Sequence, residues 1–154
     1  MLSQDLVGRE LTPFVYRTEA TKIRHFVKSL GLADAVFVDG ETAAARGFDD
    51  VPAPPGLILF VSAQDSYGEV FGALGLSYTN DLSAELDLTF HRPVVAGDEL
   101  SGRTKVVGIT QKEGSRGIVQ FLKLETRYYD TSDELVLTEI STVAHFASNA
   151  GDAA

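Results

Sequence analysis

Apolar residues recur at the spacing of one helical face early in the chain, from Ile23 to Leu30. The residues on this face are Ile23, Phe26, Val27 and Leu30. Thr18 is expected to cap the helix and Gly31 to end it, because their residue types favour those positions. A second, shorter helix is predicted from Asp39 to Arg46, with Asp39 as its N-cap. Two helices are therefore expected before the proline loop.

A run of apolar residues begins at Leu57, directly after a loop that contains three prolines. The sequence LILFV contains no polar residue, and a helix that is apolar on all sides is buried on all sides. A buried strand is the alternative, but the apolar positions that continue to Leu74 favour one long central helix. The prolines before it predict an extended path.

From Leu82 onward the pattern changes to a period of two, which is typical of half-buried strands. With an earlier strand included, the predicted strands are Leu11–Tyr16, Leu82–Phe90, Leu100–Thr110, Gly117–Asp130 and Leu135–Phe146. A curved antiparallel sheet with one apolar face can enclose an apolar helix. The fold class is therefore α+β, with a single hotdog domain over residues 1–147, in which the sheet wraps around the central helix. Residues 148–154 are expected to form a disordered tail.

Charge and composition exclude several kinds of function. The chain has 22 acidic and 13 basic residues and a formal charge of −9, which argues against binding to nucleic acid. It has no cysteine, and none of its three histidines has a second ligand at metal-binding spacing, so neither a metal nor a cofactor is expected. The histidines His25, His91 and His145 are each interpreted as structural. Without a membrane-spanning run or a signal peptide, a cytoplasmic location is expected.

Several stretches, in order, resemble the MaoC-like hydratase/dehydratase family, and within it the FAS1-like dehydratases. They are VGRE, the helix that begins TKIRHF, the spacing from DGETAAARGFDD to the proline loop, and LTFHRPVVAGDEL, which fits F-x-x-P-V-x-x-G-D-x-L. The resemblance covers about residues 6 to 146. It implies hydration of enoyl thioesters, or the reverse dehydration, with a carboxylate and an imidazole that exchange protons with water and substrate.

The residues that perform this chemistry in the family are absent. Where the family has G-D-x-N-P-x-H, the expected Asp, Asn and His fall on Ala33, Ala35 and Val38. In the later A-H-G element, the His and Gly fall on Pro54 and Pro55, and proline has no N–H to stabilise an oxyanion. No catalytic residue is therefore predicted in this chain. A shift of the alignment by one residue would offer Asp34 as the acid, but no histidine would then follow at the required place.

The resemblance implies a non-catalytic subunit of a (3R)-hydroxyacyl thioester dehydratase in fatty acid metabolism. A second, catalytic MaoC-like hotdog chain would supply the Asp and His in a heterodimer or larger assembly. The substrate would be a thioester of CoA or of acyl carrier protein. Its acyl chain would pass along the start of the central helix, and the predicted substrate-binding residues are Pro54, Gly56, Leu57 and Phe60.

Two alternatives remain open. A homodimeric hotdog acyl-thioesterase could use Asp65 or Glu69, which lie four residues apart and hence on one helix face. The chain could also be a non-enzymatic protein that binds acyl thioesters.

Overall fold

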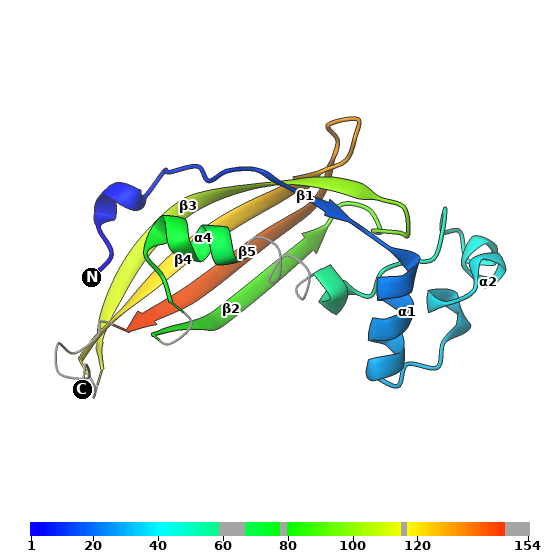
Figure 1. The fold of residues 1–154 in the computed structure, drawn as a ribbon, viewed down its shortest axis with the longest axis horizontal. Coiled ribbons are helices and arrows are strands. Elements are labelled where there is room, and N and C mark those ends of the chain that lie inside the picture. The colour runs from blue at the N-terminus through cyan, green and yellow to red at the C-terminus, as the bar shows by residue number, and fades with distance from the viewer. Residues whose placement is uncertain (59–66, 78–79, 115–116, 147–154) are drawn as a thin grey trace.

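A five-stranded antiparallel sheet forms the body of the protein in the computed structural model (Figure 1). The structure describes residues 1–58, 67–77, 80–114 and 117–146. The strand order is β1-β3-β4-β5-β2. The strands are β1 (Phe14–Arg17), β2 (Asp81–Phe90), β3 (Glu99–Gly114), β4 (Gly117–Tyr129) and β5 (Leu135–Phe146). All five predicted strands are present, and the tail predicted at residues 148–154 lies outside the described residues.

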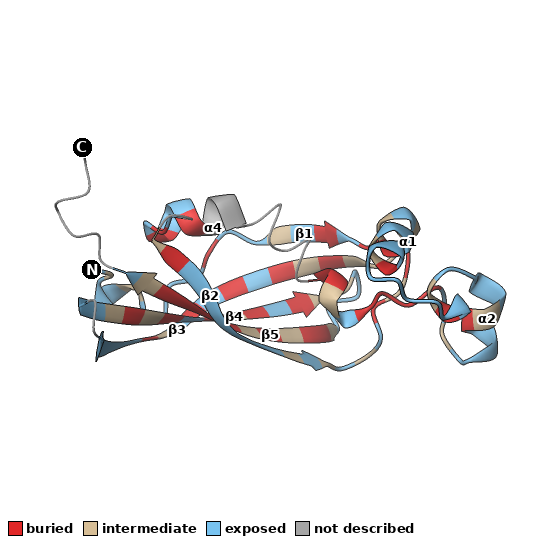
Figure 2. Cartoon of the chain, turned by 90° about the horizontal axis from the view of Figure 1, so that it is seen from below, coloured by how far each residue is buried: buried red, intermediate tan, exposed pale blue. Residues whose placement is uncertain are grey.

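Alternating side chains give the sheet one buried face. Along β4, Gln120, Leu122, Leu124, Thr126 and Tyr128 are buried, as the predicted period of two requires (Figure 2). β2 departs from this pattern, because it lies at the end of the sheet and most of its residues are exposed. The expectation that β2 is half-buried along its length is therefore wrong within this single chain.

Short helices gather at one end of the sheet (Figure 1). They are the α-helices α1 (Ala20–Ser29) and α2 (Gly40–Ala45) and the 3-10 helix η2 (Ala35–Phe37); a further 3-10 helix, η1 (Gln4–Leu6), lies near the N-terminus. Asp39 caps α2 as predicted, since its carboxylate accepts a hydrogen bond from the Thr42 amide at 2.8 Å. Thr18 does not cap α1. Its own amide donates to Asp98 O and its carbonyl accepts from Gly97, which fixes Thr18 against the turn before β3 with its side chain buried.

The turn Arg92–Asp98 explains part of the recognised LTFHRPVVAGDEL stretch in structural terms. Asp98 accepts hydrogen bonds from two Arg92 nitrogens at 2.8 and 3.1 Å and from the Val95 amide at 2.9 Å. Gly97 has a φ of +89°, a conformation that favours glycine. These residues build the turn into β3 rather than a catalytic site.

The central helix predicted from Leu57 to Leu74 lies partly outside the described residues. Residues 55–58 form a helical turn, and α4 (Tyr67–Leu74) covers the C-terminal end of the predicted range. The helical turn begins two residues earlier than the sequence pattern predicts, with Pro55 at the start. Proline is tolerated in a first helical turn because the amide that it lacks would have no intrahelical partner there. No helix among the residues that can be described is long and apolar enough to cross a membrane.

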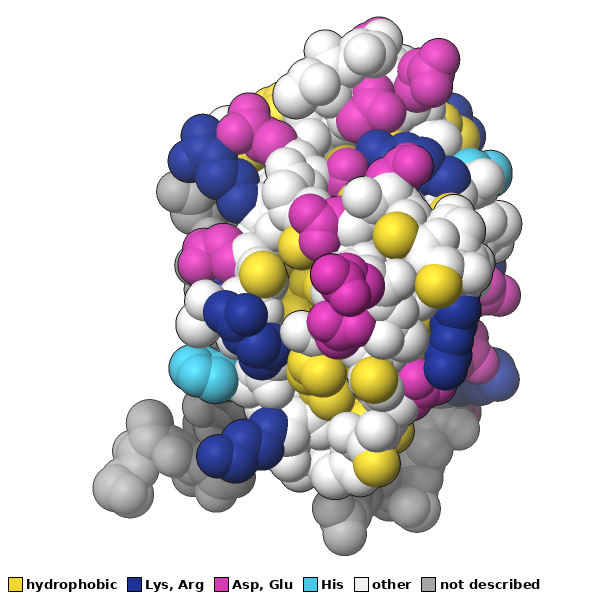
Figure 3. Space-filling view, turned by 90° about the vertical axis from the view of Figure 1, so that its right-hand side faces the viewer, with side chains coloured by type: hydrophobic (Ala, Val, Ile, Leu, Met, Phe, Trp, Pro, Cys, Tyr) yellow, Lys and Arg dark blue, Asp and Glu magenta, His cyan; other side chains and the backbone are white. Residues whose placement is uncertain are grey.

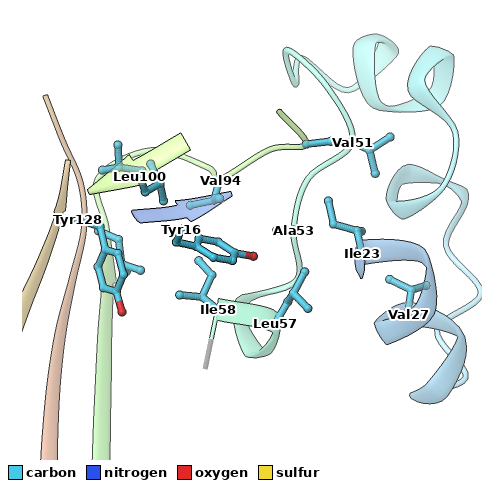
Figure 4. Close-up of a cluster of buried hydrophobic side chains, with 13 residues drawn as sticks. Tyr16, Ile23, Val27, Val51, Ala53, Leu57, Ile58, Val94, Leu100 and Tyr128 are labelled. Carbon is cyan, nitrogen blue, oxygen red and sulfur yellow. The ribbon is translucent and has the colours of Figure 1, made fainter. Parts of the chain in front are cut away.

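Two clusters of buried side chains form the core. One joins α1, residues 51–58 and the near end of the sheet, and includes Ile23, Leu57, Ile58 and Tyr128 (Figure 4). The other lies under α4 at the opposite end and includes Phe71, Leu74 and Leu122. Leu57 and Ile58 thus belong to the first cluster, and the residues of α4 belong to the second.

Candidate functional site

The segment where the family carries its acid and base, residues 33–38, lies between α1 and α2 and contacts both helices through η2. Asp34 accepts a hydrogen bond from the Val36 amide at 3.1 Å and so caps η2. Phe26 of α1 lies over Gly56, because a Cβ on that glycine would fall 3.2 Å from Phe26 Cζ. The contact seats α1 against the first turn of the central helix.

The three positions expected to carry the Asp, Asn and His present only small or apolar side chains. Ala33 and Ala35 are exposed, and Val38 is 46% exposed. None of these side chains can exchange a proton with water or substrate. The end of the molecule that carries α1 and α2 shows apolar side chains scattered among acidic and basic ones (Figure 3).

Asp34, the neighbouring carboxylate, is engaged structurally. Arg46 Nη1 donates to Asp34 Oδ2 at 2.7 Å, and this hydrogen bond is the main cause that lowers the pKa of Asp34; the Val36 amide contributes as well. A carboxylate stabilised in its charged form by an arginine is a poor proton donor at neutral pH. Its surroundings therefore favour a role as cap and ion-pair partner.

The proline segment is fixed to the turn before β3 by backbone contacts. Ala53 N donates to Val94 O at 2.8 Å, and Pro52 forms an isolated bridge with Val95. Pro54 is buried and its carbonyl accepts from Leu57 N at 2.9 Å, which begins the helix. The helix start thus contains two consecutive residues, 54 and 55, that have no N–H to offer an oxyanion.

The predicted substrate-binding residues lie together at this helix start, as far as they are described. Leu57 is 3% exposed and is directed toward Ile23 and Val27 of α1, while the next residue, Ile58, lies by the ring of Tyr16 (Figure 4). Phe60 lies outside the described residues.

The alternative catalytic residues cannot be assigned a geometry. Asp65 lies outside the part of the chain that the structure describes. Glu69 is on α4, but its side chain is likewise outside it. His25 is exposed on α1, and His91 Nε2 lies 3.1 Å from the Thr138 hydroxyl.

Two pairs of titratable side chains were not predicted from the sequence. Glu139 is 4% exposed and accepts a hydrogen bond from the Tyr128 hydroxyl at 2.7 Å; burial raises its pKa. His145 Nδ1 lies 2.6 Å from Asp81 Oδ1. Each pair joins residues on two neighbouring strands. The alternation of apolar residues along one strand does not predict which residues of the next strand lie opposite.

The strand β2 forms one free edge of the sheet. β2 is ten residues long, and only β5 pairs with it among the described strands. Leu82 and Leu86 on this strand are 59% and 37% exposed. A long edge strand with exposed apolar side chains is a surface that proteins usually cover or pair.

Comparison with known proteins identifies the family. Residues 5–139 match the family model described as "FAS1-like, dehydratase domain region". The chain belongs to this family. It is 36% identical, over 137 residues, to the UPF0336 protein Franean1_6066 of Parafrankia sp. (strain EAN1pec), with 88% of each chain covered.

Solved structures show the same fold. A chain from the C-terminally truncated HadBC (3R-hydroxyacyl-ACP dehydratase) complex of Mycobacterium tuberculosis superposes with a TM-score of 0.80 at 21% identity, covering 93% of this chain and 99% of that one. A chain from the ChsH1-ChsH2 complex of the same organism gives 0.71 at 19% identity, covering 92% and 87%. The predicted fold class, α+β with a hotdog domain, is confirmed.

Proposed function

We propose that this chain is a subunit of a (3R)-hydroxyacyl thioester dehydratase in which a second hotdog chain supplies the catalytic Asp and His. The observation that carries the proposal is the combination of family membership with Ala33, Ala35 and Val38 at the acid–base positions. General acid–base catalysis contributes about 10²- to 10⁴-fold to such reactions, and these side chains cannot provide it.

The free edge of β2 supports a partner that is itself a hotdog protein. A second chain that added its own edge strand to β2 would satisfy the outward backbone groups and cover Leu82 and Leu86. The two solved neighbours come from complexes named after two different chains, HadBC and ChsH1-ChsH2.

In this assembly the chain's own contribution is to shape the acyl channel. Pro54, Gly56, Leu57 and Phe60 are proposed to form its wall, with α1 held over Gly56 by Phe26. The acyl thioester would be bound to CoA or to acyl carrier protein.

The test compares hydration of a trans-2-enoyl-CoA by this chain alone, by a catalytic MaoC-like partner alone, and by the co-purified pair. We expect the lone chain to be inactive and the pair to be active. Replacing the partner's catalytic His by Ala should abolish the activity of the pair. Robust hydration by the lone chain would overturn the proposal.

A further inference from the structure

The face of the sheet that is turned away from α4 carries charges of opposite sign along its two sides. Phe71 and Leu74 of α4 belong to the same buried cluster as Leu122 of β4, so α4 lies on the inner side of the sheet (Figure 2). Side chains alternate along a strand, and Lys123 and Arg127 of β4 therefore lie on the opposite side, where they are exposed. We call this side the outer face.

The half of the outer face formed by β3 and β4 is basic. Its basic residues are Arg103, Lys105 and Lys112 on β3 and Lys123 and Arg127 on β4. The acids among them are engaged within the chain, in the ion pairs Arg103–Asp133, Arg127–Glu125 and, beside β1, Arg17–Glu99. Lys112 Nζ lies 5.6 Å from the centre of the Phe121 ring. Neither Lys112 nor Lys123 forms an ion pair with another described residue.

The half formed by β2 is acidic. Glu85 and Asp87 are exposed on this strand, and within the described part of the chain neither carboxylate forms an ion pair. Thr142 of β5 is the register partner of both Glu85 and Lys123, and its hydroxyl donates to Glu85 Oε2 at 3.5 Å. Glu85 is therefore on the outer face, two strands away from Lys123. Since neighbouring strands are about 4.8 Å apart, roughly 10 Å separates the two backbones, and the opposite charges are not directly paired within one chain.

The strand between these two halves presents no charge on the outer face. The residues of β5 that point outward are Thr138, Ile140, Thr142 and Ala144. Thr142 and Ala144 are buried between their neighbours, and Ile140 is half-buried. A strip of short, uncharged side chains allows a second sheet to pack flat against it, at the spacing of about 10 Å that stacked sheets adopt.

This arrangement of charges is complementary to itself. A two-fold axis parallel to β5 turns a second copy so that its β2 lies over β4 of the first, and its β4 over β2. Lys123 of each copy then faces Glu85 of the other, and the contact is formed twice. A uniformly acidic partner would be repelled by Glu85 and Asp87, and a uniformly basic one by Lys112 and Lys123. The charges therefore favour a second copy as the occupant.

We propose that the outer face is a self-association surface, on which a second copy of this chain packs about a two-fold axis parallel to β5. The face is distinct from the β2 edge, so a hotdog partner and a second copy can bind at the same time. The strands β3, β4, β5 and β2 together present a face of roughly 20 by 30 Å, the size of the smaller specific interfaces. The association is accordingly weak.

The test measures self-association of the full-length chain alone by sedimentation equilibrium. At about 0.15 M ionic strength the Debye length is about 8 Å, which screens the general repulsion between two acidic chains but not short contacts. The parent should associate at about 100 μM. Lys123→Glu or Glu85→Lys alone should raise the Kd about fivefold or more, whereas the two together should restore it to within about twofold of the parent.

Two comparisons separate this contact from a general effect of charge. Glu85→Lys makes the chain less acidic, so reduced repulsion alone would strengthen association, opposite to the expected result. Lys28→Glu, at an exposed position on α1, changes the net charge by the same amount as Lys123→Glu and should leave the Kd unchanged.

A cross-link tests the position of the axis. The chain has no cysteine, so one introduced cysteine reports one position. Ile140→Cys lies near the proposed axis and should be joined to its copy by a bis-maleimide with a span of about 10 Å. Val15→Cys, exposed on the outer face of β1, is three strands from β5 and should not be joined.

The proposal is overturned if the parent stays monomeric at about 100 μM, or if the combined charge exchange fails to restore association. It is also overturned if Val15→Cys is cross-linked as readily as Ile140→Cys. Pairing of two copies through their β2 edges would leave the Kd of Lys123→Glu at the parent's value, which likewise contradicts it. Hydration by this chain with a catalytic partner is a separate measurement, so neither result decides the other.

Discussion

The ring of Phe14 on β1 lies directly over Gly102 on β3, its partner in the strand register. A Cβ at residue 102 would fall 2.2 Å from Phe14 Cζ. On its other side, the ring meets Tyr128 edge to face, with centroids 5.8 Å apart, and Tyr128 donates to the buried Glu139. Because Gly102 has no side chain, the Phe14 ring can lie over it and contact Tyr128, which in turn binds Glu139.

Gly102→Ala should lower the free energy of unfolding by about 1–3 kcal/mol, because the new methyl group must displace the Phe14 ring and disturb its contact with Tyr128. Chemical denaturation measures the change. Gly108→Ala on the same strand is the control, since nothing lies within 4 Å of its added Cβ. An equal loss in both variants would show that the aromatic contact is not the cause.

Glu139→Gln should stabilise the protein more as the pH rises. Burial raises the pKa of Glu139, so the folded state favours the protonated acid. Below the unfolded-state pKa of about 4.3, Glu139 is protonated in both states and does not oppose folding. As the pH rises from there toward the folded-state pKa, only the unfolded state releases the proton, and the free energy of unfolding falls. Gln imitates the neutral acid and can still accept from Tyr128.

Denaturation of Glu139→Gln and of the parent at about pH 4, 6 and 8 should show a difference that grows across this range. Glu113→Gln, at an exposed position on β3, is the control and should show no such trend. A difference that shrinks with pH would mean that the carboxylate, not the acid, is favoured in the fold.

Asp34→Asn should leave the hydration rate of the assembled pair within about twofold of the parent, because Asp34 is occupied by Arg46 and the Val36 amide. If Asp34 were the general acid, its loss would cost about 10²- to 10⁴-fold. The measurement is kcat with a trans-2-enoyl-CoA. Stability should change little, because the ion pair with Arg46 is exposed and screened by solvent.

Leu82→Asp combined with Leu86→Asp should weaken association with the hotdog partner by about tenfold or more, because charges would be placed where the partner strand covers apolar side chains. Sedimentation of the mixed chains measures the association. Val15→Asp is the matched control: it is 57% exposed and lies on β1, the strand at the opposite edge of the sheet. If Val15→Asp weakens association and the β2 variant does not, the partner uses the other edge.

Local patterns were sufficient for the elements themselves. Period two along β4 identified its buried face, and β5 begins and ends where the alternation predicted it. Asp39 capped α2 because a cap is a contact between neighbours in sequence. Thr18 was misassigned for the complementary reason. Its backbone bonds go to Asp98 and Gly97, about eighty residues away, and no local preference reveals them.

The missing acid and base at Ala33, Ala35 and Val38 were also decided by the sequence alone, because a side chain without a titratable group cannot gain one by folding. The tertiary structure decided where charge is buried. Glu139 meets Tyr128, and Asp81 meets His145, only because antiparallel register brings distant strands together, and burial then shifts the proton affinity of Glu139. Residue types fix which chemistry a chain can perform, whereas long-range packing fixes the surroundings in which each group performs it.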